Sequence, residues 1–233
     1  MLFSEIFKLS QKEKKDTIKK LIAKSYPGAS FYVLIILSSC LAAIGLIIDN
    51  VAVLIGSMLI APLLYPIIFL GMSVVLHDGG ILNRTLLIIG KIIILGVSIG
   101  CISTFLLRPF VELTETGIFQ QGSILPVFYV AVISGLAAAF SIVRNTLEEF
   151  LPGVAVSIAL LPPLINIGVS LGFGNLSALV SSLQHFILNI FGIVFASLLV
   201  FSLMDFSTEI KIAKKTLKEE EKCLKEGEIE FKE

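Results

Sequence analysis

The chain has 233 residues, of which 56% are hydrophobic and only 15% are charged, and its mean hydropathy is +0.97. A soluble domain carries about 25% charged residues, so the composition excludes a soluble globular, a disordered or a nucleic-acid-binding protein. The formal net charge of +0 conceals a separation, because residues 30–204 hold only ten charged residues and the two ends hold the other 26. The sequence therefore predicts an all-α integral membrane protein with two short polar ends.

The N-terminal segment, residues 1–29, is predicted to be a cytoplasmic amphipathic segment. Three apolar side chains and one serine fall on one helical face, and lysines lie beside them: Ile18, Leu21, Ile22 and Ser25, flanked by Lys15, Lys19 and Lys20. This pattern is typical of a helix that lies on a membrane surface. No small-residue cleavage site follows the first apolar run, so we expect this run to be retained as a signal anchor.

Six stretches are long and apolar enough to cross a membrane, since a hydrocarbon core of about 30 Å requires about 20 residues. These spans are residues 30–48, 51–76, 83–107, 123–143, 150–172 and 183–204. An extracytoplasmic loop is predicted at 108–122. Residues 172–182 are expected to form an irregular break, and the charged residues 205–233 are expected to continue the last span as a solvated cytoplasmic helix.

The distribution of lysine and arginine predicts the orientation. Each end of the chain carries seven lysines, and six spans place both ends on the same side of the membrane. Arg84 and Arg144 fall on that side as well, whereas Arg108 falls on the other. By the positive-inside rule both ends are cytoplasmic, and the protein is a multi-pass protein of the cell membrane.

Two tight joints connect spans one to two and four to five. They contain Asp49 and Asn50 in the first joint, and Arg144 and Asn145 in the second. Asn and Asp suit turns because their short side chains hydrogen-bond to nearby backbone groups. We interpret these four residues mainly as joint residues.

The second and fifth spans resemble each other. Residues 56–67 align without gaps with residues 156–167, and Ser, Pro, Leu and Ile recur at the same offsets. The repeating unit is then three spans, residues 30–107 and 123–204, and an odd number of spans inverts the second copy. Inverted repeats are the plan of many secondary transporters. The alternative is a chance alignment of two apolar segments.

Four prolines in these two spans carry the candidate site: Pro62, Pro66, Pro162 and Pro163. Pro62 lies roughly 18 Å into its span at about 1.5 Å per residue, and Pro162 reaches a similar depth. Proline has no N–H and displaces the carbonyl four residues earlier. We therefore predict broken helices, with regular hydrogen bonding lost at 61–66 and 161–166, and freed carbonyls that line an ion or solute site. The alternative is that these prolines only kink the helices.

Other polar side chains within the spans complete the candidate set. Ser57 and Ser157 precede the prolines by about one and a half turns, and Tyr65 and Asn166 follow them. Asn166 aligns with Pro66 and has an amide without an obvious partner in the sequence. Lys91 is the one formal charge well inside a span. It is either functional or extends its ammonium group to the cytoplasmic head groups.

Glycine spacing indicates close helix packing. Gly96 and Gly100 form a GxxxG pattern on the third span, and Gly168 and Gly172 form another on the fifth. Small-residue faces of this kind are also compatible with a homo-oligomer.

The segments Ala43–Leu46, Asp49–Asn50, Val53–Leu63 and Pro66–Ile67 resemble a prokaryotic family of hydrophobic membrane proteins, domain of unknown function 389 (DUF389). Ala159–Pro163 and Asn166 extend the likeness over most of residues 25–205. Ser57 stands where the family usually has Ala, and Tyr65 where it usually has Gly. The resemblance implies a bacterial or archaeal multi-pass membrane protein and supplies no catalytic residues.

We expect a transporter or channel for a small ion or polar solute, with its site between the broken helices. One alternative is a scaffold or sensor that does not transport. A remote alternative is an intramembrane hydrolase that uses Ser57 and His185, although the sequence around Ser57 lacks the expected glycines. The partners are the lipid bilayer and the unknown solute. No cofactor, nucleotide or metal motif is present, so we expect no enzymatic activity and no metal.

Overall fold

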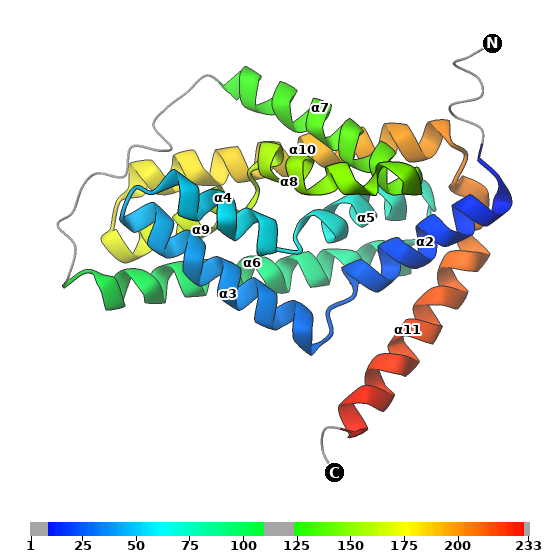
Figure 1. The fold of residues 1–233 in the computed structure, drawn as a ribbon, viewed down its shortest axis with the longest axis horizontal. Coiled ribbons are helices and arrows are strands. Elements are labelled where there is room, and N and C mark those ends of the chain that lie inside the picture. The colour runs from blue at the N-terminus through cyan, green and yellow to red at the C-terminus, as the bar shows by residue number, and fades with distance from the viewer. Residues whose placement is uncertain (1–8, 110–123, 231–233) are drawn as a thin grey trace.

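The computed structural model describes residues 9–109 and 124–230, and within them it contains helices and turns but no strand. Most of the predicted loop at 108–122 lies outside the described residues. Figure 1 shows a bundle of helices with two further helices at one end. The elements are α2 (Gln11–Ser25), α3 (Ala29–Ile47), α4 (Val51–Ile60), α5 (Leu64–Val75), α6 (Gly79–Leu107), α7 (Ile124–Val143), a 3-10 helix (Asn145–Phe150), α8 (Leu151–Ile158), α9 (Leu161–Phe173), α10 (Leu176–Leu203), a second 3-10 turn (Ser207–Glu209) and α11 (Ile210–Glu230).

Five segments of the described chain are long and apolar enough to cross a membrane: α3, α6, α7, the pair α8–α9, and α10. The pair α4–α5 makes a sixth if it is counted as one span, with a bend of 53° between its helices. The prediction of a helical membrane protein is therefore confirmed by length and composition.

One boundary of the predicted spans was wrong by seven residues. The last span was predicted to start at 183, but α10 starts at Leu176, and the irregular break at 172–182 is only a short turn. The reason is a cap: the Asn175 side chain accepts a hydrogen bond from the N–H of Ala178, which satisfies an N-terminal donor. The Ser182 hydroxyl then donates to the carbonyl of Ala178 within the helix.

The two short helices α5 and α9 occupy the centre of the bundle. Nearly every residue of both is buried, including Ile68, Phe69, Ile165 and Val169. α5 packs mainly on α10, α6 and α2, whereas α9 packs on α6, α10 and α3. A helix that is apolar all round requires neighbours on every side. The long helices α3, α6 and α10 supply most of them.

Glycines set the distance between the central helices and these long helices. The two GxxxG patterns face each other, because a Cβ on Gly168 would lie 2.1 Å from the carbonyl oxygen of Val97 and one on Gly100 would lie 2.5 Å from that of Ile165. Gly71 of α5 makes the corresponding approach to α10, where a Cβ would lie 2.5 Å from the Cβ of Ser197. Only glycine permits backbones to approach this closely.

The N- and C-terminal helices pack on the bundle and on each other. Ile18, Leu21 and Ile22 of α2 are fully buried against α5, α7 and α11. The prediction that this face lies on lipid was wrong, because protein covers it. We call this end of the bundle the tail end, and the opposite end, where α3 meets α4 and α9 meets α10, the loop end.

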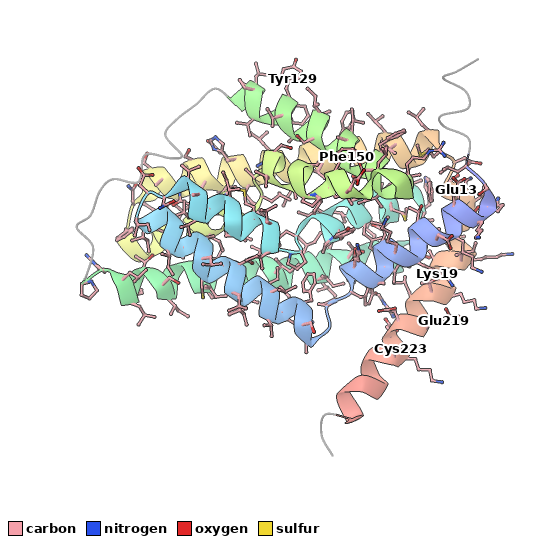
Figure 2. All side chains as sticks on the ribbon, viewed as in Figure 1. Glu13, Lys19, Tyr129, Phe150, Glu219 and Cys223 are labelled. Carbon is pink, nitrogen blue, oxygen red and sulfur yellow. The ribbon has the colours of Figure 1, made fainter. Side chains whose placement is uncertain are left out.

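Residues 205–233 were expected to continue the last span as a charged helix; a helix is present there, but it does not continue α10 directly. Asp205 has a positive φ of 55° and turns the chain away from α10. Lys14 of α2 donates to the Asp205 carbonyl at 2.5 Å, Lys214 pairs with Asp78 at 2.6 Å, and Arg84 pairs with Glu221. Figure 2 shows polar side chains, such as Lys19 and Glu219, along both helices of the tail end.

In the second part of each half, several features recur at a spacing of 97 residues. α5 and α9 begin at Leu64 and Leu161, and α6 and α10 begin at Gly79 and Leu176. Asp78 and Asn175 cap α6 and α10 in the same way, each accepting from the N–H three residues later. The sequence alignment, which pairs residues 100 apart, fits the starts of α4 and α8 at Val51 and Leu151, and is three residues out of register with α5 and α9.

Replacing Gly168 by alanine tests the contact between α6 and α9. The new Cβ would overlap the Val97 carbonyl, and we expect a loss of about 1–3 kcal/mol of stability from overpacking. Gly90→Ala on α6 is the control, because a Cβ there has no neighbour within 4 Å. Unfolding in detergent measures both, and equal stability of the two variants would contradict the contact.

Candidate functional site

The first helix break separates α4 from α5. α4 ends at Ile60, Ala61 is extended, and the Ala61 N–H still donates to the Ser57 carbonyl at 3.2 Å. Pro62 follows without an N–H and lines a cavity. Pro66 lies in the first turn of α5, where a missing N–H costs little. The expected loss of helix at 61–66 is therefore confined to 61–63.

The second break separates α8 from α9 and lies earlier than predicted. Ala159 adopts a left-handed conformation with φ of 47°, and α9 begins at Leu161. The predicted loss of regular helix at 161–166 was therefore wrong. Pro162 and Pro163 fall within the first turn of α9, where the N–H groups have no intrahelical acceptor in any case.

Asn189 of α10 was not assigned a role from the sequence. Its side-chain amide donates to the Ala159 carbonyl at 3.4 Å, at the residue where α8 ends. An amide in the middle of an apolar helix is the one signal in the sequence that marks such a residue. The break is thus stabilised by a side chain from another helix.

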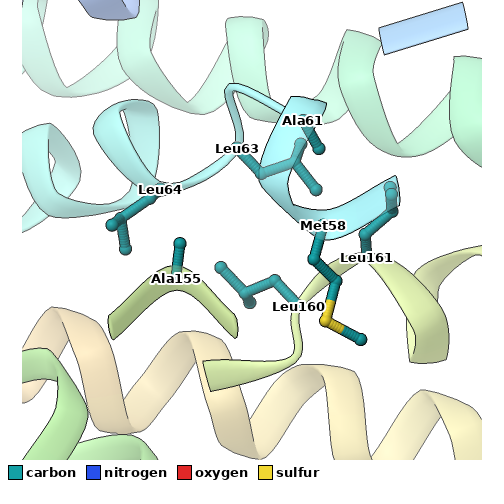
Figure 3. Close-up of a pocket in the computed structure, with 7 residues that line it drawn as sticks. All are labelled: Met58, Ala61, Leu63, Leu64, Ala155, Leu160 and Leu161. Atoms are coloured by element: carbon teal, nitrogen blue, oxygen red, sulfur yellow. The ribbon is translucent and has the colours of Figure 1, made fainter. Parts of the chain in front are cut away.

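The two breaks meet in the centre of the molecule. Residues from both line one small cavity of about 20 Å³: Met58, Ala61, Leu63, Leu64, Ala155, Leu160 and Leu161. Figure 3 shows these side chains, which are all apolar, converging from the two interrupted helices. Residues beside both interruptions therefore line one cavity, and that lining is apolar.

A larger cavity of about 500 Å³ reaches the first break from the side of α2. We call it the tail-side cavity. Its polar lining residues are Lys24, Tyr65 and Glu149, and its apolar lining includes Pro62. Lys24 Nζ donates to the Tyr65 hydroxyl at 3.0 Å and lies 4.7 Å from the centre of the ring. Tyr65 therefore lies at the entrance of the tail-side cavity, where the Lys24 ammonium group contacts both its hydroxyl and its ring.

A third cavity of about 280 Å³ reaches the second break between α7, α8 and α10. We call it the loop-side cavity. Ser157, Ala159, Pro163, His185 and Asn189 line it. Ser157 donates to the Ser134 hydroxyl at 2.9 Å. Each break therefore has its own cavity, and the small apolar cavity lies between the breaks.

Five predicted site residues do not line these cavities: Pro66 and Pro162, which lie in the first turns of α5 and α9, and Ser57, Lys91 and Asn166. Ser57 is buried and donates to the Leu54 carbonyl at 2.7 Å. Lys91 is exposed on α6. Asn166 is fully buried, and its amide donates to the Ser182 hydroxyl at 2.7 Å. Among the described residues, Asn166 Oδ1 has no hydrogen-bond partner.

The joint residues make local contacts. Asp49 has a positive φ of 52°, and the Asn50 side chain caps α4 by accepting from the N–H groups of Ala52 and Val53. Arg144 pairs with Glu13 of α2 at 3.3 Å. Asn145 opens the 3-10 helix before α8, and its side chain is outside the described residues.

The parts of the chain that the structure describes contain no cluster of three metal-ligating side chains. Ser57 and His185 each hydrogen-bond a backbone carbonyl of their own helix, and they share none of the three cavities described above. This placement gives the hydrolase hypothesis no geometric support.

The fold defines a helical membrane protein with interrupted central helices. Residues 58–195 match the family model described as "Domain of unknown function (DUF389)", and the chain belongs to this family. It is 30% identical over 172 residues to an uncharacterized protein of Methanocaldococcus jannaschii, an alignment that covers 72% of this chain and 52% of the relative. The chain thus spans about half of that relative's length. No solved structure matches it.

Replacing Asn166 by leucine separates a binding role from a structural one. The substitution removes a buried acceptor without a partner, while Ser182 keeps its bond to Ala178. We expect stability within about 1 kcal/mol of the wild type, because removal of an unsatisfied polar group offsets the lost hydrogen bond. Thermal unfolding in detergent measures this, and a loss above about 3 kcal/mol would show that the amide is structural. Ser182→Ala is the matched control.

Proposed function

We propose that this protein moves a small ion or polar solute across the membrane, as a carrier or channel, through a site between its two interrupted helices. The observation that carries the proposal is the meeting of the two breaks, each reached by its own cavity from a different end of the bundle. Interrupted helices at a common depth supply backbone groups to solutes in many transporters.

The proposal includes an inverted repeat, residues 30–107 and 123–204. Supporting it, α3, α4, α5 and α6 run opposite to α7, α8, α9 and α10 respectively (Figure 1). The contacts also exchange: α5 packs on α10 as α9 packs on α6, and α3 packs on α4 as α7 packs on α8.

Individual residues support the same relation. Gly71 approaches Val194 and Ser197. The residues 97 positions away from these three make the matching contacts, since Gly168 approaches Val97 and lies against Gly100. His77 and Gly174, which precede the two caps by one residue, share a positive φ. A chance resemblance between apolar segments gives no reason for these features to recur at one spacing.

The solute path would run from the tail-side cavity through the small apolar cavity to the loop-side cavity. Freed carbonyls at the breaks and the Asn166 amide are the groups we expect to contact the solute once the apolar contact opens. Broken backbone is tolerated in a membrane only where protein or water surrounds it. We propose a transport role without enzymatic activity, and both ends of the chain in the cytoplasm.

Adding backbone donors at the breaks should impair transport. Pro62→Ala together with Pro162→Ala adds one N–H in the first break and one in the first turn of α9, directly after the second break, and should lower flux at least about tenfold. The assay follows the light scattering of proteoliposomes challenged with potassium chloride, sodium acetate or potassium phosphate. Pro27→Ala, in the turn between α2 and α3, is the control. Saturating flux would indicate a carrier, and unitary currents a channel.

If wild-type proteoliposomes are no more permeable to any of these salts than empty liposomes are, the result contradicts transport of the ions of these salts. Flux that survives deletion of α11 and disappears with the proline substitutions would oppose a scaffold that signals through its tails.

Cysteine labelling tests the orientation. In a background with Cys40, Cys101 and Cys223 replaced by serine, S177C at the exposed start of α10 should react with a membrane-impermeant maleimide in intact cells. A variant that retains only Cys223 should react only after lysis, because the tail end carries the lysines. Labelling of Cys223 in intact cells would overturn the orientation.

A further inference from the structure

The geometry points to a binding site for an anionic phospholipid in the tail-side cavity, with the phosphate beside Lys24 and one acyl chain against α4 and α8. This goes beyond the transport proposal, because the site binds lipid whether or not a solute crosses. Three observations carry it: the chemistry of the walls, the sideways opening and the charge at the entrance.

The walls of the cavity suit a hydrocarbon chain. Apart from Lys24, Tyr65 and Glu149, its lining is apolar, with Met58, Leu59 and Ile60 on one side and Leu151 and Ala155 on the other. The volume of about 500 Å³ is large for a dehydrated inorganic ion. A hydrocarbon chain placed between these walls buries apolar area on both sides.

The cavity opens toward the surface that hydrocarbon covers. Leu59 is 54% exposed and Ile60 40%, and Phe150, at the end of the 3-10 helix beside α8, is 57% exposed. Apolar side chains left uncovered on a membrane-spanning surface contact lipid. A chain can therefore enter from the side without crossing a polar barrier.

The entrance carries positive charge at the level of α2, outside the spans. Lys20 lies one helical turn before Lys24, and burial together with the Lys24 charge lowers the pKa of Lys20 to about 8. Glu149 is the carboxylate among the described lining residues, and it is exposed. An anion beside Lys24 and the Tyr65 hydroxyl would also weaken the repulsion that the Lys24 ammonium exerts on Lys20. Lysine near the membrane surface attracts anionic lipid head groups.

The chain contains no tryptophan, so one introduced indole reports on one position. L59W places the indole on the cavity wall, and L87W places it on exposed α6 as the control. Each variant is reconstituted in phosphatidylcholine nanodiscs that contain a small fraction of brominated phosphatidylglycerol or brominated phosphatidylcholine. Bromine quenches tryptophan on contact, so the ratio of quenching by the two lipids measures selectivity.

We expect phosphatidylglycerol to quench L59W at about one-fifth of the phosphatidylcholine concentration, the preference that one lysine confers, and both lipids to quench L87W equally. Adding Lys24→Gln to L59W should abolish the preference. Lys24→Arg should keep it, and so should Lys15→Gln, which removes an exposed lysine from the same helix.

Equal quenching of L59W by both lipids would overturn the site, and so would a preference that survives Lys24→Gln. Selective quenching by free brominated stearate, with none by brominated phosphatidylglycerol, would overturn the phospholipid assignment in favour of a soluble fatty acid. If Lys24→Gln fails to fold, the comparison of Lys24→Arg with Lys15→Gln in L59W still decides, because loss of selectivity in both would contradict a charge-based site. No flux is measured, so a failure of the transport proposal leaves this result unaffected.

Discussion

Every backbone group that proline leaves unpaired in a membrane must find a partner in protein or water, and the rest of this structure follows from that requirement. Four prolines fall in or beside two helix breaks, and each unpaired group exposed to hydrocarbon would cost several kcal/mol. The breaks therefore lie at the centre of the bundle. Asn189 donates to the carbonyl left at Ala159, and the half-helices that begin at the breaks, α5 and α9, are buried on nearly all sides.

Burial of two half-helices divides the bundle into tightly and loosely packed parts. α9 packs on α6 and α5 packs on α10 through glycines, where even a methyl group would overlap the facing backbone or side chain. α4 and α8 pack less closely, and the three cavities described above adjoin them. Cores of native density resist rearrangement. Any movement that opens a path should therefore displace α4 and α8 and keep the two glycine contacts intact.

The sequence predicted the spans well because hydrophobic length is a direct requirement of the bilayer. It failed at places where a side chain decides the local structure. Asn175 starts α10 seven residues early by capping it, and Pro162 and Pro163 open a helix instead of interrupting one. The helix on residues 11–25 has the pattern of a lipid-facing helix, and periodicity alone cannot show that α5 and α11 cover its apolar face. Asn189 and Lys24 lie far in sequence from the breaks that they serve, so no spacing could have pointed to them.

The small apolar cavity between the breaks determines what the proposed path requires. Its volume of about 20 Å³ holds about one water molecule, so a hydrated solute passes only if Met58, Leu63, Leu160 and Leu161 separate. Exposing such side chains to water costs about 1.5–3 kcal/mol each. This cost keeps the path closed at rest and has to be offset when it opens. We expect the backbone carbonyls at the breaks and the Asn166 amide to offset this cost. A solute that binds these groups adds interactions that the closed state does not have. Selectivity would then arise only after opening, which explains why the closed bundle presents leucine and methionine, and no polar ring, at its narrowest point.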